Sequence, residues 1–66
     1  MRIYINGQSE TLAEGASVAD VAHAQGWDAS RVAIEINRRI VPRSLYAQTE
    51  VGEGDRIEIV RFIGGG

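Results

Sequence analysis

Apolar and polar residues alternate in three short stretches of the chain, 2–5, 32–36 and 56–62. Successive side chains of a β-strand point to opposite faces, so this period of two predicts strands that each have one buried face. The residues expected to face the core are Ile3, Ile5, Val32, Ile34, Ile36, Ile57 and Ile59. The chain is therefore expected to build a β-sheet with one face covered.

The first strand ends at Asn6-Gly7, the dipeptide most typical of a tight hairpin, because both residues tolerate a positive φ. Residues 8–12 are then expected to return as the second strand. The first and last strands are expected to pair in parallel at the centre of the sheet.

A second turn is predicted at Asn37-Arg38, after the strand at 32–36. It leads to a short apolar segment at 40–41, which ends at a proline that has no backbone N–H for a ladder. Residues 43–48 are expected to form a short helical turn with Leu45 facing the core.

One helix is predicted after the first hairpin. Ser17 is suited to cap its first turn, and Asp20 stands three residues later as a short form of the capping box. Gly26 marks the end, because helices often stop at a residue with positive φ. The apolar stripe of this helix is Val18, Val21 and Ala22.

These elements predict an α+β fold, in which one helix packs across one face of a mixed sheet. The 66 residues fit one domain over residues 1–63, followed by a flexible glycine tail over 64–66. A chain of this size uses most of its apolar residues for one core, so a pocket for catalysis is not expected. A carrier, a subunit or an interaction module fits better than an enzyme.

Composition excludes several kinds of site. The chain has no Cys, one His and no Lys, so disulfides, thiolate metal sites and a lysine nucleophile are excluded. A net charge of -2 argues against nucleic-acid binding. The apolar stretches are too short to span a membrane, and the first residues resemble a strand rather than a signal peptide. A cytoplasmic protein without a cofactor of its own is expected.

Three consecutive glycines, Gly64, Gly65 and Gly66, end the sequence directly after the last apolar strand. Glycine is costly to order, and without Cβ atoms such a tail is thin enough to enter a narrow channel. A terminal α-carboxylate is ionised and unreactive at neutral pH. It becomes an acyl donor only when another protein activates it, for example as an adenylate. A frayed terminus is the alternative interpretation.

The stretches 56–66 and 33–43 resemble the carboxyl end and the central segment of the thiamine-biosynthesis sulfur carriers, the ThiS family. The Asn6-Gly7 hairpin and the chain length agree with this resemblance, which covers the whole chain. It implies a β-grasp, ubiquitin-like fold and a role as a carrier that is a co-substrate of partner enzymes. Gly66 is the residue that an ATP-dependent adenylating enzyme would activate, and Gly65 matches the penultimate glycine. Gly64 is a third glycine that only some members have.

The resemblance also implies three partners. They are the adenylating enzyme, which is related to ubiquitin-activating enzymes and uses ATP, a persulfide sulfur donor, and thiazole synthase. Thiazole synthase would take the sulfur of a thiocarboxylate at Gly66 into the thiazole moiety of thiamine. Two alternatives stay open: the small subunit of molybdopterin synthase, and a β-grasp interaction module whose glycines are incidental.

A docking patch for a partner is expected beside the tail. Val60, Phe62 and Tyr4 are predicted to lie on the sheet face away from the helix, where an apolar cluster suggests a binding surface. Scattered exposed apolar residues are the ordinary alternative. Ile63 is expected either to anchor the tail in the partner or to close the edge of the core.

Overall fold

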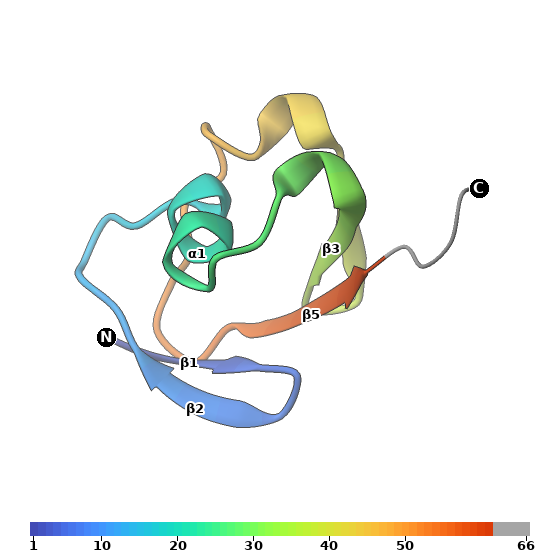
Figure 1. Cartoon of the computed structure of the whole chain (residues 1–66). Coiled ribbons are helices and arrows are strands. Elements are labelled where there is room, and N and C mark those ends of the chain that lie inside the picture. The colour runs from blue at the N-terminus through green and yellow to red at the C-terminus, as the bar shows by residue number, and fades with distance from the viewer. Residues whose placement is uncertain (62–66) are drawn as a thin grey trace.

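A five-stranded mixed sheet forms one layer of the molecule, and the helix α1 lies across one of its faces (Figure 1). The computed structural model describes residues 1–61. Its elements are β1 (Arg2–Ile5), β2 (Gln8–Thr11), α1 (Val18–Ala24), η1 (Ala29–Arg31), β3 (Val32–Ile36), β4 (Arg39–Val41), η2 (Arg43–Leu45) and β5 (Arg56–Arg61). The strand order across the sheet is β2-β1-β5-β3-β4.

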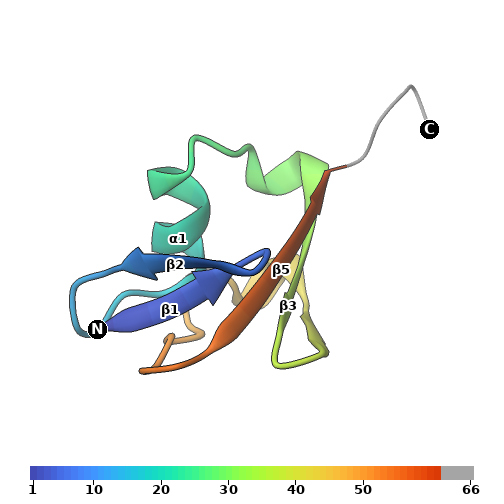
Figure 2. The same cartoon turned by 90° about the horizontal axis from the view of Figure 1, so that it is seen from below.

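The last strand, β5, occupies the centre of the sheet, as Figure 2 shows. It pairs in parallel with β1, where Tyr4 is opposite Arg56. On its other side it pairs antiparallel with β3 from Ile57 to Arg61. The predicted parallel pairing of the first and last strands is confirmed.

Both predicted tight turns are present and both use left-handed backbone. Asn6 and Gly7 have φ values of 48° and 85°, and β2 returns antiparallel to β1 through Thr11. Asn37 and Arg38 have φ values of 50° and 71° between β3 and β4. Positive φ at two central residues is the geometry that matches the right-handed twist of the flanking strands.

The helix begins and ends as the sequence predicts. The Ser17 side chain accepts a hydrogen bond from the Asp20 N–H at 3.1 Å, and the Asp20 carboxylate accepts one from the Ser17 N–H at 2.8 Å. At the other end, Gly26 has a φ of 72°, and the Trp27 N–H donates to the carbonyl of Ala22 at 2.9 Å. This Schellman motif provides hydrogen-bond donors for the free carbonyls of the last turn, in a helix too short to be stable alone.

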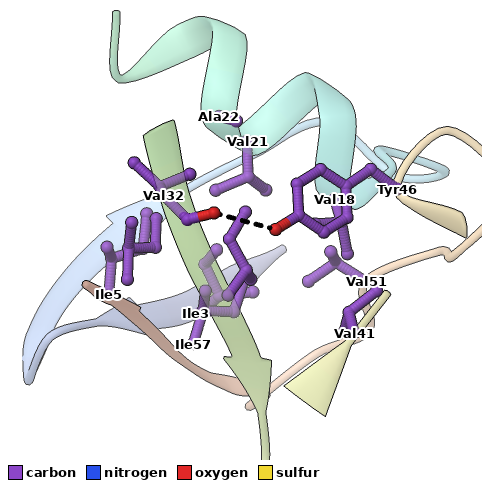
Figure 3. Close-up of a cluster of buried hydrophobic side chains, with 12 residues drawn as sticks. Ile3, Ile5, Val18, Val21, Ala22, Val32, Val41, Tyr46, Val51 and Ile57 are labelled. Atoms are coloured by element: carbon purple, nitrogen blue, oxygen red, sulfur yellow. Dashed lines mark hydrogen bonds between the residues drawn. The ribbon is translucent and has the colours of Figure 1, made fainter. Parts of the chain in front are cut away.

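The core lies between α1 and the sheet (Figure 3). Its largest fully buried side chains are Ile3, Ile34, Ile57, Val18 and Val21. The alternation in β1, β3 and β5 thus places the expected residues inside, with Ile36 partly buried at the margin.

The expectation that Leu45 faces the core is wrong. Leu45 is 43% exposed, and the next residue, Tyr46, is 4% exposed in its place. Figure 3 shows the Tyr46 side chain reaching into the core, where its hydroxyl donates to the Val32 carbonyl at 3.4 Å. The segment after Pro42 is a single 3-10 turn that ends at Leu45. The buried hydrogen bond to Val32 gives the aromatic ring of Tyr46 a place in the core that Leu45, without a polar group, could not fill in the same way.

The connection from α1 to β3 passes through η1. The Asp28 side chain caps it by accepting hydrogen bonds from the Ser30 hydroxyl and the Ser30 N–H. These bonds, with the hydroxyl contributing most, lower the pKa of the exposed Asp28 carboxyl.

Within residues 1–61, none of the helices is long and apolar enough to cross a membrane.

Candidate functional site

The candidate site is the region where β5 ends, together with the sheet face turned away from α1, which is called the outer face below. Five of the predicted site residues lie outside the described residues: Phe62, Ile63, Gly64, Gly65 and Gly66. The tail at 64–66 and the last residue of the predicted strand are therefore still predictions. Two predicted docking residues, Tyr4 and Val60, are described.

Tyr4 and Val60 both belong to the outer face but are not neighbours. Tyr4 is half-buried, and the Arg56 guanidinium lies 5.1 Å from the centre of its ring. Such cation–π contacts hold the cation over the aromatic face. Val60 lies four residues after Arg56, which is about 13 Å along a strand, and Glu58 lies between them on the same face. The structure thus places the two residues on one face without joining them.

Across the sheet from Val60, the apolar residues of the outer face among residues 1–61 lie on β3 and β4. Val60 is 58% exposed and lies opposite Ala33 in the ladder. Ile40, 73% exposed, is opposite Glu35 and therefore diagonal to Ala33, at a distance of about 7–8 Å between Cα atoms. We call Ala33, Ile40 and Val60 the outer-face patch.

Sequence reasoning missed Ile40 as a member of this patch. The period of two does predict that only one of the neighbours Ile40 and Val41 faces the core, and in the structure the buried one is Val41. The segment 40–41 is too short to show which of the two residues is buried. The register between β3 and β4 settles it.

Two carboxylates lie beside the outer-face patch. Glu35 and Glu58 are direct partners across β3 and β5, and they line a depression with Asn37, Arg38 and Arg56. Neither carboxylate takes part in an ion pair among residues 1–61. Like charges directly opposite each other weaken a sheet. The outer face thus combines apolar groups with two carboxylates and the two guanidinium groups of Arg38 and Arg56, none of which forms an ion pair among residues 1–61.

A metal site was not found in the described part of the chain. Among residues 1–61, no group of three or more His, Asp or Glu side chains is arranged to hold an ion.

Several known proteins resemble this chain over all or nearly all of its length. The model of the ThiS family matches residues 3–66. The crystal structure of a thiamine biosynthesis protein (ThiS) from Geobacter metallireducens superposes with a TM-score of 0.86 at 32% identity, covering 100% of both chains. The sulfur carrier protein ThiS of Escherichia coli is 35% identical over 66 residues, which is 100% of both proteins.

A second kind of relative is much longer than this chain. A thiazole synthase of Paramagnetospirillum magneticum is 44% identical over 66 residues. A thiazole synthase of Magnetococcus marinus is 35% identical over the same length. The chain spans 20% of the length of each of these two proteins. The fold is the ubiquitin-like β-grasp, and the chain belongs to the ThiS family.

Proposed function

We propose that this protein is a sulfur carrier for formation of the thiazole moiety of thiamine, and that it acts as a co-substrate of other enzymes. The observation that carries the proposal is the family match over residues 3–66, which includes all three terminal glycines. The names of the relatives support the same role, because one is a sulfur carrier and two are thiazole synthases.

The proposed chemistry takes place at Gly66. A carboxylate oxygen of Gly66 attacks the α-phosphorus of ATP in the adenylating enzyme, and pyrophosphate leaves. The terminal sulfur of a partner's persulfide then attacks the acyl carbon, and AMP leaves. A partner thiol attacks the other sulfur of the resulting acyl disulfide, which releases the thiocarboxylate and a disulfide between the partner sulfurs. ATP is thus a substrate of the partner, and the carrier has no cofactor of its own.

The composition of the chain suits this sequence of steps. It has no Cys whose thiol would attack the activated Gly66, and no Lys whose amine would form an isopeptide there. The lack of a side chain on Gly66 leaves the acyl carbon open to the incoming sulfur.

The outer-face patch is the proposed docking site for the adenylating enzyme. Val60 is next to the last described residue of β5, so a partner bound there stands beside the segment that it must receive. Glu35 and Glu58 with Arg38 and Arg56 offer charges of both signs beside the patch, which would pair with complementary groups of the partner. Phe62 and Ile63 are proposed to extend the patch, and Tyr4 to mark its far margin.

Thiazole synthase is the proposed acceptor of the sulfur. Two proteins with that name contain a stretch similar to this whole chain, which supports a close working relation between such a domain and the synthase. The proposed location is the cytoplasm, where ATP is supplied.

The carrier role is tested by intact mass after the protein is incubated with ATP, the adenylating enzyme and a persulfide donor. We expect a mass gain that matches one oxygen replaced by sulfur. A variant that lacks Gly66 is the control and should show no gain. An unchanged mass in the wild-type protein would leave only the interaction module.

The docking site is tested by Val60→Asp. Because Val60 is exposed, the fold should survive, while the charge should weaken binding of the adenylating enzyme about tenfold or more. Thr11→Asp places the same charge on the exposed edge strand β2 and should leave affinity within about twofold. Equal affinities of the two variants, measured by calorimetry, would remove the outer-face patch from the interface.

A further inference from the structure

We propose that Asn6 is a positioning residue that sets where the carboxyl-terminal segment leaves the fold. This inference rests on the proposed function, because a fixed exit matters only if the segment must reach a partner's active site. It starts from an asymmetry around β5. Its β3 side is paired to Arg61, whereas its β1 side loses its partner strand when β1 ends at Ile5.

The Asn6 side chain continues the ladder after β1 has ended. The Asn6 N–H still donates to the Ile57 carbonyl at 2.8 Å, as a strand residue would. Its side-chain Oδ1 then accepts from the Ile59 N–H at 2.9 Å, and its Nδ2 donates to the Ile59 carbonyl at 3.3 Å. Asn6 thus forms hydrogen bonds with both Ile57 and Ile59 of β5.

Asparagine is suited to this place for two reasons. Its amide carries one acceptor and two donor hydrogens in a plane, as a peptide group does, so it can satisfy both the N–H and the carbonyl of Ile59. It also tolerates the left-handed backbone of the turn, where its φ is 48°. An aspartate lacks the donor, and a glycine keeps the turn but loses the amide.

Ile59 is the last β5 residue that the β1–β2 hairpin holds among residues 1–61. Gly66 follows seven residues later, and a chain of that length reaches at most about 25 Å. Without the Asn6 amide, the last contact on this side moves back two residues to Ile57, and the end of β5 is held by β3 alone.

This loss has a defined consequence for a carrier. A β5 end paired on one side only samples more directions, so the terminal carboxylate spends less time at the position where it attacks ATP. Misplacement of a reacting group lowers the rate of the chemical step strongly even when binding is intact. The outer-face patch should be little affected, because Ala33, Val60 and Ile40 are joined through β3.

Asn6→Gly tests this proposal, and Asn37→Gly is its matched control. Asn37 is also an asparagine in a two-residue turn with positive φ, and its side chain also bonds to β5, but at Arg56, the opposite end of the strand. Glycine at either position keeps the turn. All measurements are made at a temperature at which circular dichroism shows each variant to be folded.

Two quantities are measured for each variant. The first is hydrogen exchange of the Ile59 amide in the free protein, by NMR. The second is the rate of pyrophosphate release by the adenylating enzyme as carrier concentration is varied, which separates kcat from KM. For Asn6→Gly we expect the exchange rate of the Ile59 amide to rise about tenfold. We expect kcat to fall about tenfold, while KM stays within about twofold of the wild-type value. Asn37→Gly should leave kcat at the wild-type value and should raise Ile59 exchange by about fivefold at most, through its smaller loss of overall stability.

The proposal is overturned if Asn6→Gly leaves kcat at the wild-type value, or if Asn37→Gly lowers kcat as much. These outcomes differ from failure of the proposed function, in which the wild-type protein itself releases no pyrophosphate. In that case the hydrogen exchange of the Ile59 amide is the only test. An exchange rate in Asn6→Gly equal to that of the wild type would overturn the anchoring role of Asn6.

Discussion

The two hairpin turns of this protein look alike in sequence but hold the central strand in different ways. Each has an asparagine with positive φ at its first central position, and each asparagine side chain bonds to β5. Asn6 bonds to the backbone of Ile59, which is 5% exposed, near the end of the strand. Asn37 bonds to the Arg56 N–H at 3.0 Å and to the Asp55 carboxylate at 3.1 Å, both in exposed positions at the start.

The difference between the two turns shows how a small domain holds its central strand from both sides. β5 has a full ladder only with β3, and turns on both sides supply the remaining contacts. A buried N–H without a partner is costly, whereas an exposed one finds water. The asparagine at the buried end is therefore expected to contribute more to stability than the one at the exposed end.

The largest expected difference comes from removing each side chain in turn. Asn6→Gly should lower the free energy of unfolding by about 2 kcal/mol, because the N–H and the carbonyl of Ile59 both lose a part-buried hydrogen bond. Asn37→Gly should lower it by about 1 kcal/mol, because water replaces its exposed bonds. Urea denaturation of both variants beside the wild type measures the two values.

The result that would break this comparison is an equal loss in both variants. It would mean that burial of Ile59 does not distinguish the two contacts. An unchanged m-value in each denaturation curve is the control that the unfolded states are comparable.

A smaller effect is expected at the second turn position of the first hairpin. Gly7 has a φ of 85°, and a Cβ added there meets nothing within 4 Å. Gly7→Ala therefore tests the backbone alone, and we expect it to lower stability by about 1 kcal/mol. A thermal unfolding midpoint equal to that of the wild type would show that the turn relaxes without cost.

The smallest effect, with the opposite sign, is expected at the same position of the second hairpin. Arg38 has a φ of 71° in place of a glycine. Arg38→Gly relieves this strain but makes the unfolded chain more flexible, so the net gain should be about 0.5 kcal/mol. Arg38→Ala keeps the strain and is the matched control, which should gain nothing. Loss of stability in Arg38→Gly would show that the arginine side chain makes a stabilising contact beside Glu35 and Glu58.

The sequence predicts those parts of the fold that follow from local rules. The period of two places Ile3, Ile34 and Ile57 in the core, and the Ser17 and Asp20 pair marks the start of α1. These predictions are confirmed because burial and capping depend on neighbours in the chain.

Other features depend on contacts between distant segments and could not be read in this way. Tyr46 takes the core place expected for Leu45, and its hydroxyl bonds to the Val32 carbonyl, 14 positions away in the chain. The Asn6 contact with Ile59 joins residues 53 positions apart, and the place of Ile40 beside Ala33 needs the register of β3 and β4. The residues that make up the outer face can therefore be identified only once the pairing of all the strands is known.

The central claim is that this chain delivers sulfur to a thiazole. It is tested most directly by preparing the protein as a thiocarboxylate with isotopically labelled sulfur and adding thiazole synthase with its other substrates. The account predicts that the label moves from the protein into the thiazole product and that the protein returns to the mass of the carboxylate. Label that stays on the protein while the synthase is active with an authentic carrier would contradict it.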